Sequence, residues 1–439
     1  MAAKGLNITW KPKRSPFDTN EFVYGEINMT NLPLAGLRVL EFTQMVMGPC
    51  CGLILADLGA EVIKIEPMPR GDRTRHLSGL AAGFFAAFNR NKKSIAVDMK
   101  SPEGLQLVKQ LVGGADIVIE NFRPGRMESL GLSYKTLSDI NEKIVYCSLK
   151  GFLPGPYDKR SALDEVVQMM GGLAYMTGLP GKPMRAGASV NDIMGAMFGV
   201  IAIQAAIRER EKTGKGQEVQ ASLFENNVFL MAQAMLAEAM TGEVSEPWSV
   251  KERPWPVYDL FDMTDGTQLF VGIIGDGQWN DFCVEFGRQE WLSDPRLQSN
   301  NDRSAQRFWL LPEVRTMLTA LPTNQLIERL EAIGLPFAPV RRPGELLQDP
   351  HLLASGGLID LTLPNGVAAR TPALPITFHG KRLNPTEGLP GVGAHTRDVL
   401  SSYGISASEI GNMIANGIVA ERPLERSGEG SVQRKAQSA

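Results

Sequence analysis

Short runs rich in β-branched residues alternate with helix-like stretches through the first half of the chain. Successive runs start roughly 22 to 33 residues apart, which is the spacing of βαβ units. One intervening stretch, 102–112, follows Ser101 as a candidate N-cap and carries Pro102 at its first helical position. We therefore expect an α/β fold with a mostly parallel sheet and helices on both faces. The predicted strands are 38–42, 61–66, 94–99, 116–121 and 144–149.

The second half of the chain mixes long apolar stretches, typical of helices, with a short β-hairpin pattern. The hairpin is indicated by Asp265-Gly266 between two β-rich runs. The last helix of this region is expected to be capped by Thr323 and ended by Gly334. The predicted elements are helices 192–211 and 218–240, hairpin strands 258–263 and 268–273, and helices 277–286 and 324–333.

Composition shifts along the chain predict two domains, one of them interrupted by the other. The proline-containing polar segment before the hairpin reads as a linker, and a proline- and glycine-rich stretch returns the chain towards the first unit. The predicted division is an N-terminal extension (1–33), the first part of a large α/β domain (34–240), a linker (241–256), a small domain (257–350), a return segment that completes the large domain (351–425) and a mobile tail (426–439).

Charge and cysteine usage exclude several classes of protein. The 45 Lys and Arg residues nearly balance the 48 Asp and Glu residues, which argues against a nucleic-acid-coating protein. The four cysteines form neither a zinc pattern nor a disulfide framework, so no metal is expected and a reducing cytosol fits best. The N-terminus lacks the apolar core of a secretory signal, and the apolar stretch 193–207 is too short to span a bilayer. We expect a cytoplasmic protein without a nucleic-acid or membrane partner.

Basic residues flank the ends of two predicted strands. Lys92 and Lys93 stand before the third strand, Lys100 follows it, and Arg123 follows the fourth, close to Asn121. Ligands of open α/β sheets bind beyond the carboxyl ends of the strands, so Lys100 and Arg123 could hold one phosphate-bearing ligand. Ordinary solvated loop charges are the alternative interpretation.

Two carboxylates stand in apolar surroundings, Asp164 ahead of a glycine pair and Asp192 at the start of the long apolar helix. As a structural residue, Asp192 is an N-cap or first-turn residue favoured by the helix dipole. As a functional residue, it is a carboxylate nucleophile kept ionised in a water-poor cleft. These alternatives stay open on the residues alone. The turn at 46–52 does not fit the dinucleotide-binding pattern, and the chain lacks a GxSxG nucleophile elbow.

The chain resembles the class III CoA-transferases, the superfamily of formyl-CoA transferase, carnitine CoA-transferase and related racemases, which includes CaiB/BaiF-like proteins. The resemblance runs from about residue 34 to 402 and rests on ordered motifs: LAGLRVLEF at 34–42, LADLGAEVIKIEP at 55–67, NKKSI at 91–95, ENFRPG at 120–125, TGKGQ at 213–217 and GAHT at 393–396. It implies a large Rossmann-like domain with a mostly parallel sheet, a smaller α+β domain, and two protomers interlocked as a homodimer.

The resemblance also implies site residues. Asp192 takes the position of the nucleophile, and Asp164 is a second, supporting carboxylate. Coenzyme A or acyl-CoA is implied as a substrate, with no tightly bound cofactor. The implied CoA contacts are Val97, Lys100, Asn121, Phe122, Arg123 and Arg160, and the implied substrate and lid residues are Gln44, Gly275 and Gly277.

Departures from the family pattern narrow the predicted activity. Leu163 stands where the racemase branch has its proton-transferring histidine, which argues against racemisation. Gln44 and Val46 replace a His and a Gln of the formyl-CoA transferase branch, which argues against oxalate and formate. We predict CoA transfer from an acyl-CoA donor such as succinyl-CoA to a small dicarboxylate, through aspartyl anhydride and aspartyl-CoA thioester intermediates. The alternatives are an acyl-CoA racemase or isomerase and a non-catalytic CoA-binding homologue.

Overall fold

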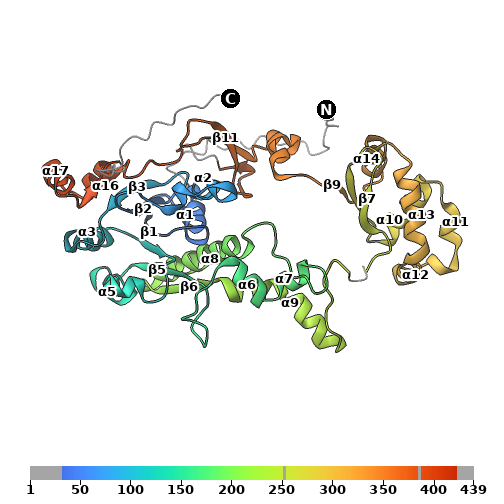
Figure 1. Cartoon of the computed structure of the whole chain (residues 1–439), viewed down its shortest axis with the longest axis horizontal. Coiled ribbons are helices and arrows are strands. Elements are labelled where there is room, and N and C mark those ends of the chain that lie inside the picture. The colour runs from blue at the N-terminus through green and yellow to red at the C-terminus, as the bar shows by residue number, and fades with distance from the viewer. Residues whose placement is uncertain (1–31, 251–253, 384–386, 423–439) are drawn as a thin grey trace, which may run out of the picture. The chain divides into compact units, whose positions relative to one another are not determined.

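One large, mostly parallel sheet organises the first part of the chain (Figure 1). The computed structural model describes residues 32–250, 254–383 and 387–422; the predicted tail and nearly all of the predicted N-terminal extension lie outside them. The sheet order is β14-β3-β2-β1-β4-β5-β6, and only the β14–β3 pair is antiparallel. The predicted α/β class with a mostly parallel sheet is confirmed. The strands are β1 (Arg38–Phe42), β2 (Glu61–Pro67), β3 (Lys93–Val97), β4 (Ile117–Glu120), β5 (Val145–Lys150), β6 (Glu218–Ser222) and β14 (Val419–Ala420).

Helices connect most of these strands, and two small antiparallel sheets lie in the segment that follows α15. The helices are α1 (Met47–Asp57), α2 (Phe84–Phe88), α3 (Pro102–Val112), α4 (Arg126–Ser129), α5 (Tyr134–Ile140), α6 (Asp164–Met170), α7 (Leu173–Thr177), α8 (Val190–Thr213), α9 (Leu223–Thr241), α15 (Pro350–Ala354), α16 (Thr396–Ser402) and α17 (Ala407–Ala415). The small sheets pair β10 (Leu358–Thr362) with β11 (Ala368–Pro372) and β12 (Thr377–Phe378) with β13 (Lys381–Arg382).

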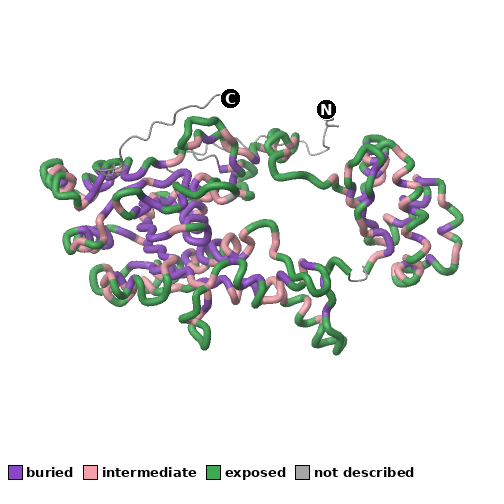
Figure 2. Tube along the Cα trace, viewed as in Figure 1, coloured by how far each residue is buried: buried purple, intermediate pink, exposed green. Residues whose placement is uncertain are grey.

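Each face of the large sheet has its own apolar core, because successive strand residues point to opposite faces. On one face Val39 and Ile117 pack with apolar residues of α1 and α8. On the other face Leu40 and Val118 pack with residues of α3, α16 and α17. Figure 2 shows the buried residues concentrated along these strands. The predicted placement of helices on both faces is therefore confirmed.

The prediction of one helix over 218–240 is wrong at its start. The first five residues form the edge strand β6, which pairs in parallel with β5, and α9 begins only at Leu223. Within β6 the first three residues are exposed or half-buried, and only Ala221 and Ser222 are buried. An edge strand of mixed polarity needs little apolar sequence, so the apolar periodicity of α9 masked it.

Helix α8 extends beyond both ends of the predicted 192–211. Judged by length and composition, it is the one helix in the described part of the chain that could cross a membrane; its small residues Gly195, Ala196 and Gly199 are buried in the sheet core. A Cβ on Gly195 would stand 2.5 Å from Cε of Met47, and a Cβ on Gly199 would stand 2.8 Å from Cδ2 of Leu149. Both contacts are shorter than packed atoms allow, so glycine permits α8 to lie this close to α1 and β5.

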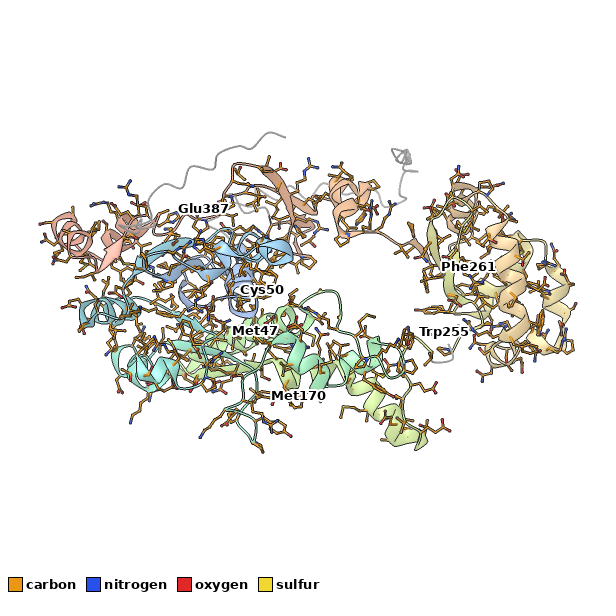
Figure 3. The ribbon with its side chains drawn as sticks, viewed as in Figure 1. Met47, Cys50, Met170, Trp255, Phe261 and Glu387 are labelled. Atoms are coloured by element: carbon orange, nitrogen blue, oxygen red, sulfur yellow. The ribbon has the colours of Figure 1, made fainter. Side chains whose placement is uncertain are left out.

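Val250–Asp349 forms a second compact unit with an aromatic core that includes Phe261 (Figure 3). The predicted hairpin is confirmed, with Gly266 in the left-handed region at φ 84°. Thr323 is the first residue of its helix rather than the cap, which is Pro322. The domain boundaries predicted above stay predictions. The elements are β7 (Tyr258–Asp262), β8 (Gln268–Gly272), β9 (Phe337–Pro339), α10 (Asp276–Glu285), α11 (Gln289–Ser293), α12 (Asn300–Ala305), α13 (Arg307–Thr319) and α14 (Thr323–Ala332).

A buried group of charged side chains, the Glu41 network, lies beneath the start of α1. Lys64 Nζ is 3.1 Å from Glu41 Oε1 and 2.9 Å from Asp72 Oδ2, and Lys92 Nζ is 2.7 Å from Glu41 Oε2. Burial opposes ionisation of Glu41, but the charges of Lys92 and Lys64 outweigh it and hold its pKa below the ordinary value. Two carboxylates and two ammonium groups make the network neutral, which is how buried charges are tolerated.

Gly52 of α1 closes over this network, and a Cβ there would stand 1.8 Å from Glu41 Oε2. We expect Gly52→Ala to lower the free energy of unfolding by about 3 kcal/mol, because backbone or ion pair must move. Gly411→Ala is the matched control: Gly411 also lies within a helix, α17, but its Cβ would meet nothing within 4 Å. That change should raise stability by about 0.5 to 1 kcal/mol. Denaturant unfolding measures both, and equal effects would contradict the expectation.

Candidate active site

The start of α8 is capped by a residue from another helix. The N-cap position, Ser189, contributes no side-chain hydrogen bond. Instead, Asp164 Oδ1 accepts the N–H of Asn191 at 2.9 Å and the N–H of Asp192 at 3.3 Å. Helix N–H groups without intrahelical partners need such acceptors when they are buried. Asp164 therefore stabilises the first turn of α8, and the Asp192 side chain is left free of that role.

Gln168 and Arg185 hold the Asp164 side chain in place. Its buried Oδ2 accepts a hydrogen bond from Gln168 Nε2 and lies 3.5 Å from Arg185 Nη2. On the opposite side of the same turn, Asn226 Nδ2 donates to the Asn191 carbonyl at 2.8 Å. Helices α6, α8 and α9 are thus tied together around one turn. The sequence reasoning missed this role of Asn226, although two adjacent amides in the apolar helix α9 are a detectable signal.

Asp192 is half-buried in the first turn of α8, one of the placements that the sequence left open. Burial is the largest cause that raises its pKa, to about 7, and the charges of Asp164 and Glu165 add to the rise. A hydrogen bond with the backbone of Met47 and the charge of Arg185 act in the opposite direction. A carboxylate with this pKa is more basic, and so more nucleophilic, than an ordinary aspartate, and about half of it is ionised at neutral pH.

The loop that leads into α1 is fixed by Asn121. Its Nδ2 donates to the Gln44 carbonyl at 2.8 Å, and its Oδ1 accepts the Gln44 N–H at 2.9 Å. A Cβ on Gly48 would stand 2.4 Å from Cβ of Thr43 and 2.9 Å from Cγ of Asn121, so the loop packs tightly here. The structure therefore joins the ends of β1 and β4 just before α1, whose first residue, Met47, acts on the Asp192 carboxylate as a backbone hydrogen-bond donor. Sequence patterns carry no signal for a backbone donor of this kind.

The predicted CoA contacts are spread along the carboxyl end of the sheet. Lys100 and Arg123 are exposed. Neither side chain forms an ion pair with any residue that the structure describes. They follow β3 and β4, which are separated by β2 and β1, so roughly 14 Å of sheet lies between them. Such a span suits an elongated polyanion better than a single phosphate.

The other predicted contacts differ in what they can offer a ligand. The Val97 side chain is fully buried at the end of β3, so only its backbone could contact a ligand. Phe122 is half-buried, and its carbonyl accepts a hydrogen bond from Lys150 Nζ at 3.1 Å. Arg160 is exposed and stacks over the Tyr157 ring at 4.1 Å. Lys92, a candidate strand-end cation in the sequence, is instead buried in the Glu41 network.

Gly275 and Gly277 lie in the second unit. Gly275 immediately precedes α10, and Gly277 is the second residue of that helix. Their predicted role in a lid stays a prediction. In the described residues no three His, Cys, Asp or Glu side chains are grouped as metal ligands would be.

The sequence pattern that defines CoA-transferase family III matches residues 34–396. The chain belongs to this family. It is 32% identical to an acyl-CoA transferase of Fusarium pseudograminearum, over 92% of each chain, and 32% identical to a succinate–glutarate CoA-transferase of Agrobacterium fabrum, over 84% of this chain and 95% of that one. A solved CAIB/BAIF family protein from Brucella suis is 33% identical, with a TM-score of 0.74 over 85% of this chain and all of the other. The predicted resemblance is confirmed, and the chain is an enzyme of the CoA-transferase class.

The raised pKa of Asp192 predicts a gain in stability for Asp192→Asn at alkaline pH. A carboxyl whose pKa is raised from 3.8 to about 7 favours the folded state when protonated, and this contribution disappears as pH rises through 7. We expect the variant to match the wild type at pH 4 and to exceed its free energy of unfolding by roughly 2 to 4 kcal/mol at pH 8. Denaturant unfolding across this pH range is the measurement.

Glu61→Gln is the control of opposite sign. Burial opposes its ionisation, but hydrogen bonds from Lys93 and Arg38 outweigh burial and hold the pKa of Glu61 below its ordinary value. A carboxyl with a lowered pKa stabilises the folded state at pH values above its ordinary pKa, and this stabilisation is lost in acid. The Glu61→Gln variant should therefore be less stable than the wild type at pH 8. The same pH trend in both variants would contradict the assignment for Asp192.

Proposed function

We propose that this enzyme moves CoA from an acyl-CoA donor to a free carboxylic acid through covalent intermediates on Asp192. The observation that carries the proposal is the Asp192 carboxylate, with its pKa raised to about 7, in a capped helix turn beside the Met47 N–H. A basic carboxylate in a partly dry position suits nucleophilic attack on a thioester. Membership of CoA-transferase family III supports the reaction class.

In the first half of the proposed reaction, CoA moves from the donor acid to the Asp192 carboxyl group. An oxygen of Asp192 attacks the donor thioester carbonyl, the C–S bond breaks, and a mixed anhydride and CoA thiolate form. The thiolate then attacks the aspartyl carbonyl, which releases the donor acid as a carboxylate and leaves an aspartyl-CoA thioester. No ATP is needed, because each intermediate retains the activation of the original thioester.

The second half runs the same steps in reverse with the acceptor. The acceptor carboxylate attacks the aspartyl thioester and forms a new mixed anhydride, again releasing CoA thiolate. The thiolate attacks the acceptor carbonyl, which gives the product acyl-CoA and free Asp192. Each tetrahedral intermediate places negative charge on an oxygen of the aspartyl or the acyl carbonyl.

The Met47 N–H is the donor that this geometry offers to the charge on the aspartyl oxygen. The N–H groups of Asn191 and Asp192 at the start of α8 could otherwise serve as such donors, but Asp164 accepts both of them. Met47, at the start of α1, points its N–H at the Asp192 carboxylate. A fixed backbone donor in a site of low dielectric stabilises such charge without reorganisation.

Lys100, Arg123 and Arg160 are proposed to hold the phosphates of CoA, and Arg185 is proposed to contact a distal carboxylate of the acceptor. Arg185 Nη1 pairs with Glu165, and its Nη2 lies 3.5 Å from Asp164 Oδ2, so the acceptor would share this cation. The relatives whose names include succinate or succinyl-CoA and glutarate support succinyl-CoA as donor and a small dicarboxylate as acceptor.

We further propose an interlocked homodimer in the cytoplasm. Several large apolar side chains of α8 and α9 are exposed in the single chain, and such a surface is typical of one that packs against another subunit. The four cysteines are all free and buried, as a reducing compartment allows. The exposed side chains are Met197, Ile201, Phe229, Met235, Leu236 and Met240.

Asp192→Ala is expected to abolish turnover, by at least about 1000-fold, because the covalent intermediates cannot form. A panel of acyl-CoA donors and free acids measures turnover, and hydroxylamine trapping followed by digestion identifies the acylated peptide. Binding of CoA and the folded state should be retained. A trapped modification outside the peptide that contains Asp192 would contradict the mechanism, and α-deuterium exchange without added acid would favour the racemase alternative.

Lys100→Ala combined with Arg123→Ala should raise KM for the acyl-CoA by about tenfold and weaken its salt dependence, with kcat little changed. Lys143→Ala is the matched control. Lys143 is also exposed, but it lies before β5, at the amino-terminal ends of the parallel strands rather than at the carboxyl ends. Equal effects of the double variant and the control on KM would show that these cations do not bind CoA.

A further inference from the structure

Lys92 is a fully buried ammonium for which the proposed reaction has no use. Its Nζ donates to the Pro49 carbonyl at 2.8 Å and to Asn89 Oδ1 at 3.2 Å, and lies 2.7 Å from Glu41 Oε2. Two hydrogen bonds and one ion pair therefore engage the ammonium group. They come from α1, from the segment before β3 and from β1, so one side chain joins three separate parts of the fold.

The partner on α1 lies in the first turn of that helix. Pro49 is its third residue, and the N-cap position, Val46, contributes no side-chain hydrogen bond. The same turn begins with Met47, whose side chain packs against Gly195 of α8 and whose backbone acts on the Asp192 carboxylate as a hydrogen-bond donor. A shift of this turn would move the Met47 N–H relative to Asp192. Lys92 is therefore placed to hold the turn from the core side.

The thiol of Cys50 links the two regions. Burial raises the pKa of Cys50 to about 12, and the charges of both Lys92 and Asp192 also act on it. Cys50 and Met47 lie together on α1 (Figure 3). Lys92 and Asp192 are therefore both close enough to Cys50 for their charges to act on it, so the Glu41 network is near the candidate nucleophile.

Four groups surround the Lys92 ammonium electrostatically: Glu41 on β1, Lys64 on β2, and Cys50 and Asp57 on α1. Burial is the largest cause that lowers its pKa, to about 8; Glu41 opposes this and Lys64 adds to it. Near neutral pH the ammonium is therefore charged, so it can keep its two hydrogen bonds and its ion pair with Glu41.

We propose that Lys92 is a positioning residue for CoA transfer: it joins the Pro49 carbonyl to the Glu41 carboxylate and so keeps the Met47 N–H directed at Asp192. The inference rests on the proposed function, since it assigns Lys92 a role in that reaction. Lys92 does not touch the reacting atoms and acts through the first turn of α1.

The test separates positioning from simple stability. Lys92→Met alone leaves Glu41 with an uncompensated charge, so the decisive variant is Glu41→Gln combined with Lys92→Met, which removes both charges. The matched control is Asp57→Asn combined with Arg90→Met. It removes another buried ion pair, of 2.6 Å, at the far end of the same helix.

Both double variants should unfold at similar temperatures. We expect the Glu41→Gln, Lys92→Met enzyme to lose about 10- to 100-fold in kcat, while KM for the acyl-CoA stays within about twofold. The acid limb of its pH profile should move upward, because loss of the Met47 hydrogen bond raises the pKa of Asp192 further. The control should keep the wild-type kcat and acid limb. A Glu41→Gln, Lys92→Met enzyme with wild-type kcat and acid limb would overturn the proposal.

A substrate-free measurement separates failure of this inference from failure of the proposed function. Hydrogen exchange of the peptide that spans the first turn of α1 should quicken in Glu41→Gln, Lys92→Met and not in the control. Unchanged exchange would overturn the positioning role whatever reaction the enzyme performs. If Glu41→Gln, Lys92→Met does not fold, Glu41→Gln with Lys92→Gln is tested in its place, since glutamine retains a neutral donor for the Pro49 carbonyl. That variant should exchange as slowly as the wild type, and faster exchange would also overturn the proposal.

Discussion

The cap that Asp164 provides for α8 is the interaction on which the rest of the site depends. A buried helix end needs acceptors for its first N–H groups, and a residue of α6 supplies one for Asn191 and Asp192. This arrangement separates two tasks that one aspartate often combines. Asp164 stabilises the helix, and Asp192 keeps its carboxylate for chemistry. The negative charge of the cap also contributes to the raised pKa of its neighbour.

That separation has a cost in stability, which the surrounding structure offsets. Burying Asp192 beside two carboxylates disfavours its charged form, and the Met47 N–H and Arg185 counteract only part of this effect. The compensation is distributed over α6, α8 and α9, whose amides fix the turn, and over two apolar cores on either side of the sheet. Destabilised functional groups are common in active sites that are held by a rigid scaffold.

The sequence predicted the frame of the molecule well, because β-strands and capped helices carry local signals. Strand 38–42 and helix 102–112 have the predicted bounds, and Ser101 Oγ accepts the Gly104 N–H as an N-cap should. Strand β6 was missed because an edge strand carries little apolar pattern. Its place at the start of an apolar helix made Asp192 a candidate, and the resemblance to the family favoured the nucleophile over the structural interpretation.

The missed parts of the site depend on contacts between distant segments. Lys92 resembles a surface charge in a basic motif, and only the folded chain shows it against Glu41 and Pro49. The Met47 N–H has no side-chain signature at all. The predicted ligand contact of Asn121 stays a prediction, and no sequence signal indicated that the backbone of Gln44 engages its amide on both sides.

The glycines of α8 have a consequence for how substrate range can change within this fold. Gly195 and Gly199 let α8 lie against the side chains of Met47 and Leu149, so the helix is packed closely against α1 and β5 near its first turn. A larger side chain at either position would have to displace these side chains or move the helix that carries Asp192. A bulkier or longer acyl chain is therefore more easily accommodated by changes in the loops at the rim of the sheet than by changes at these two glycines.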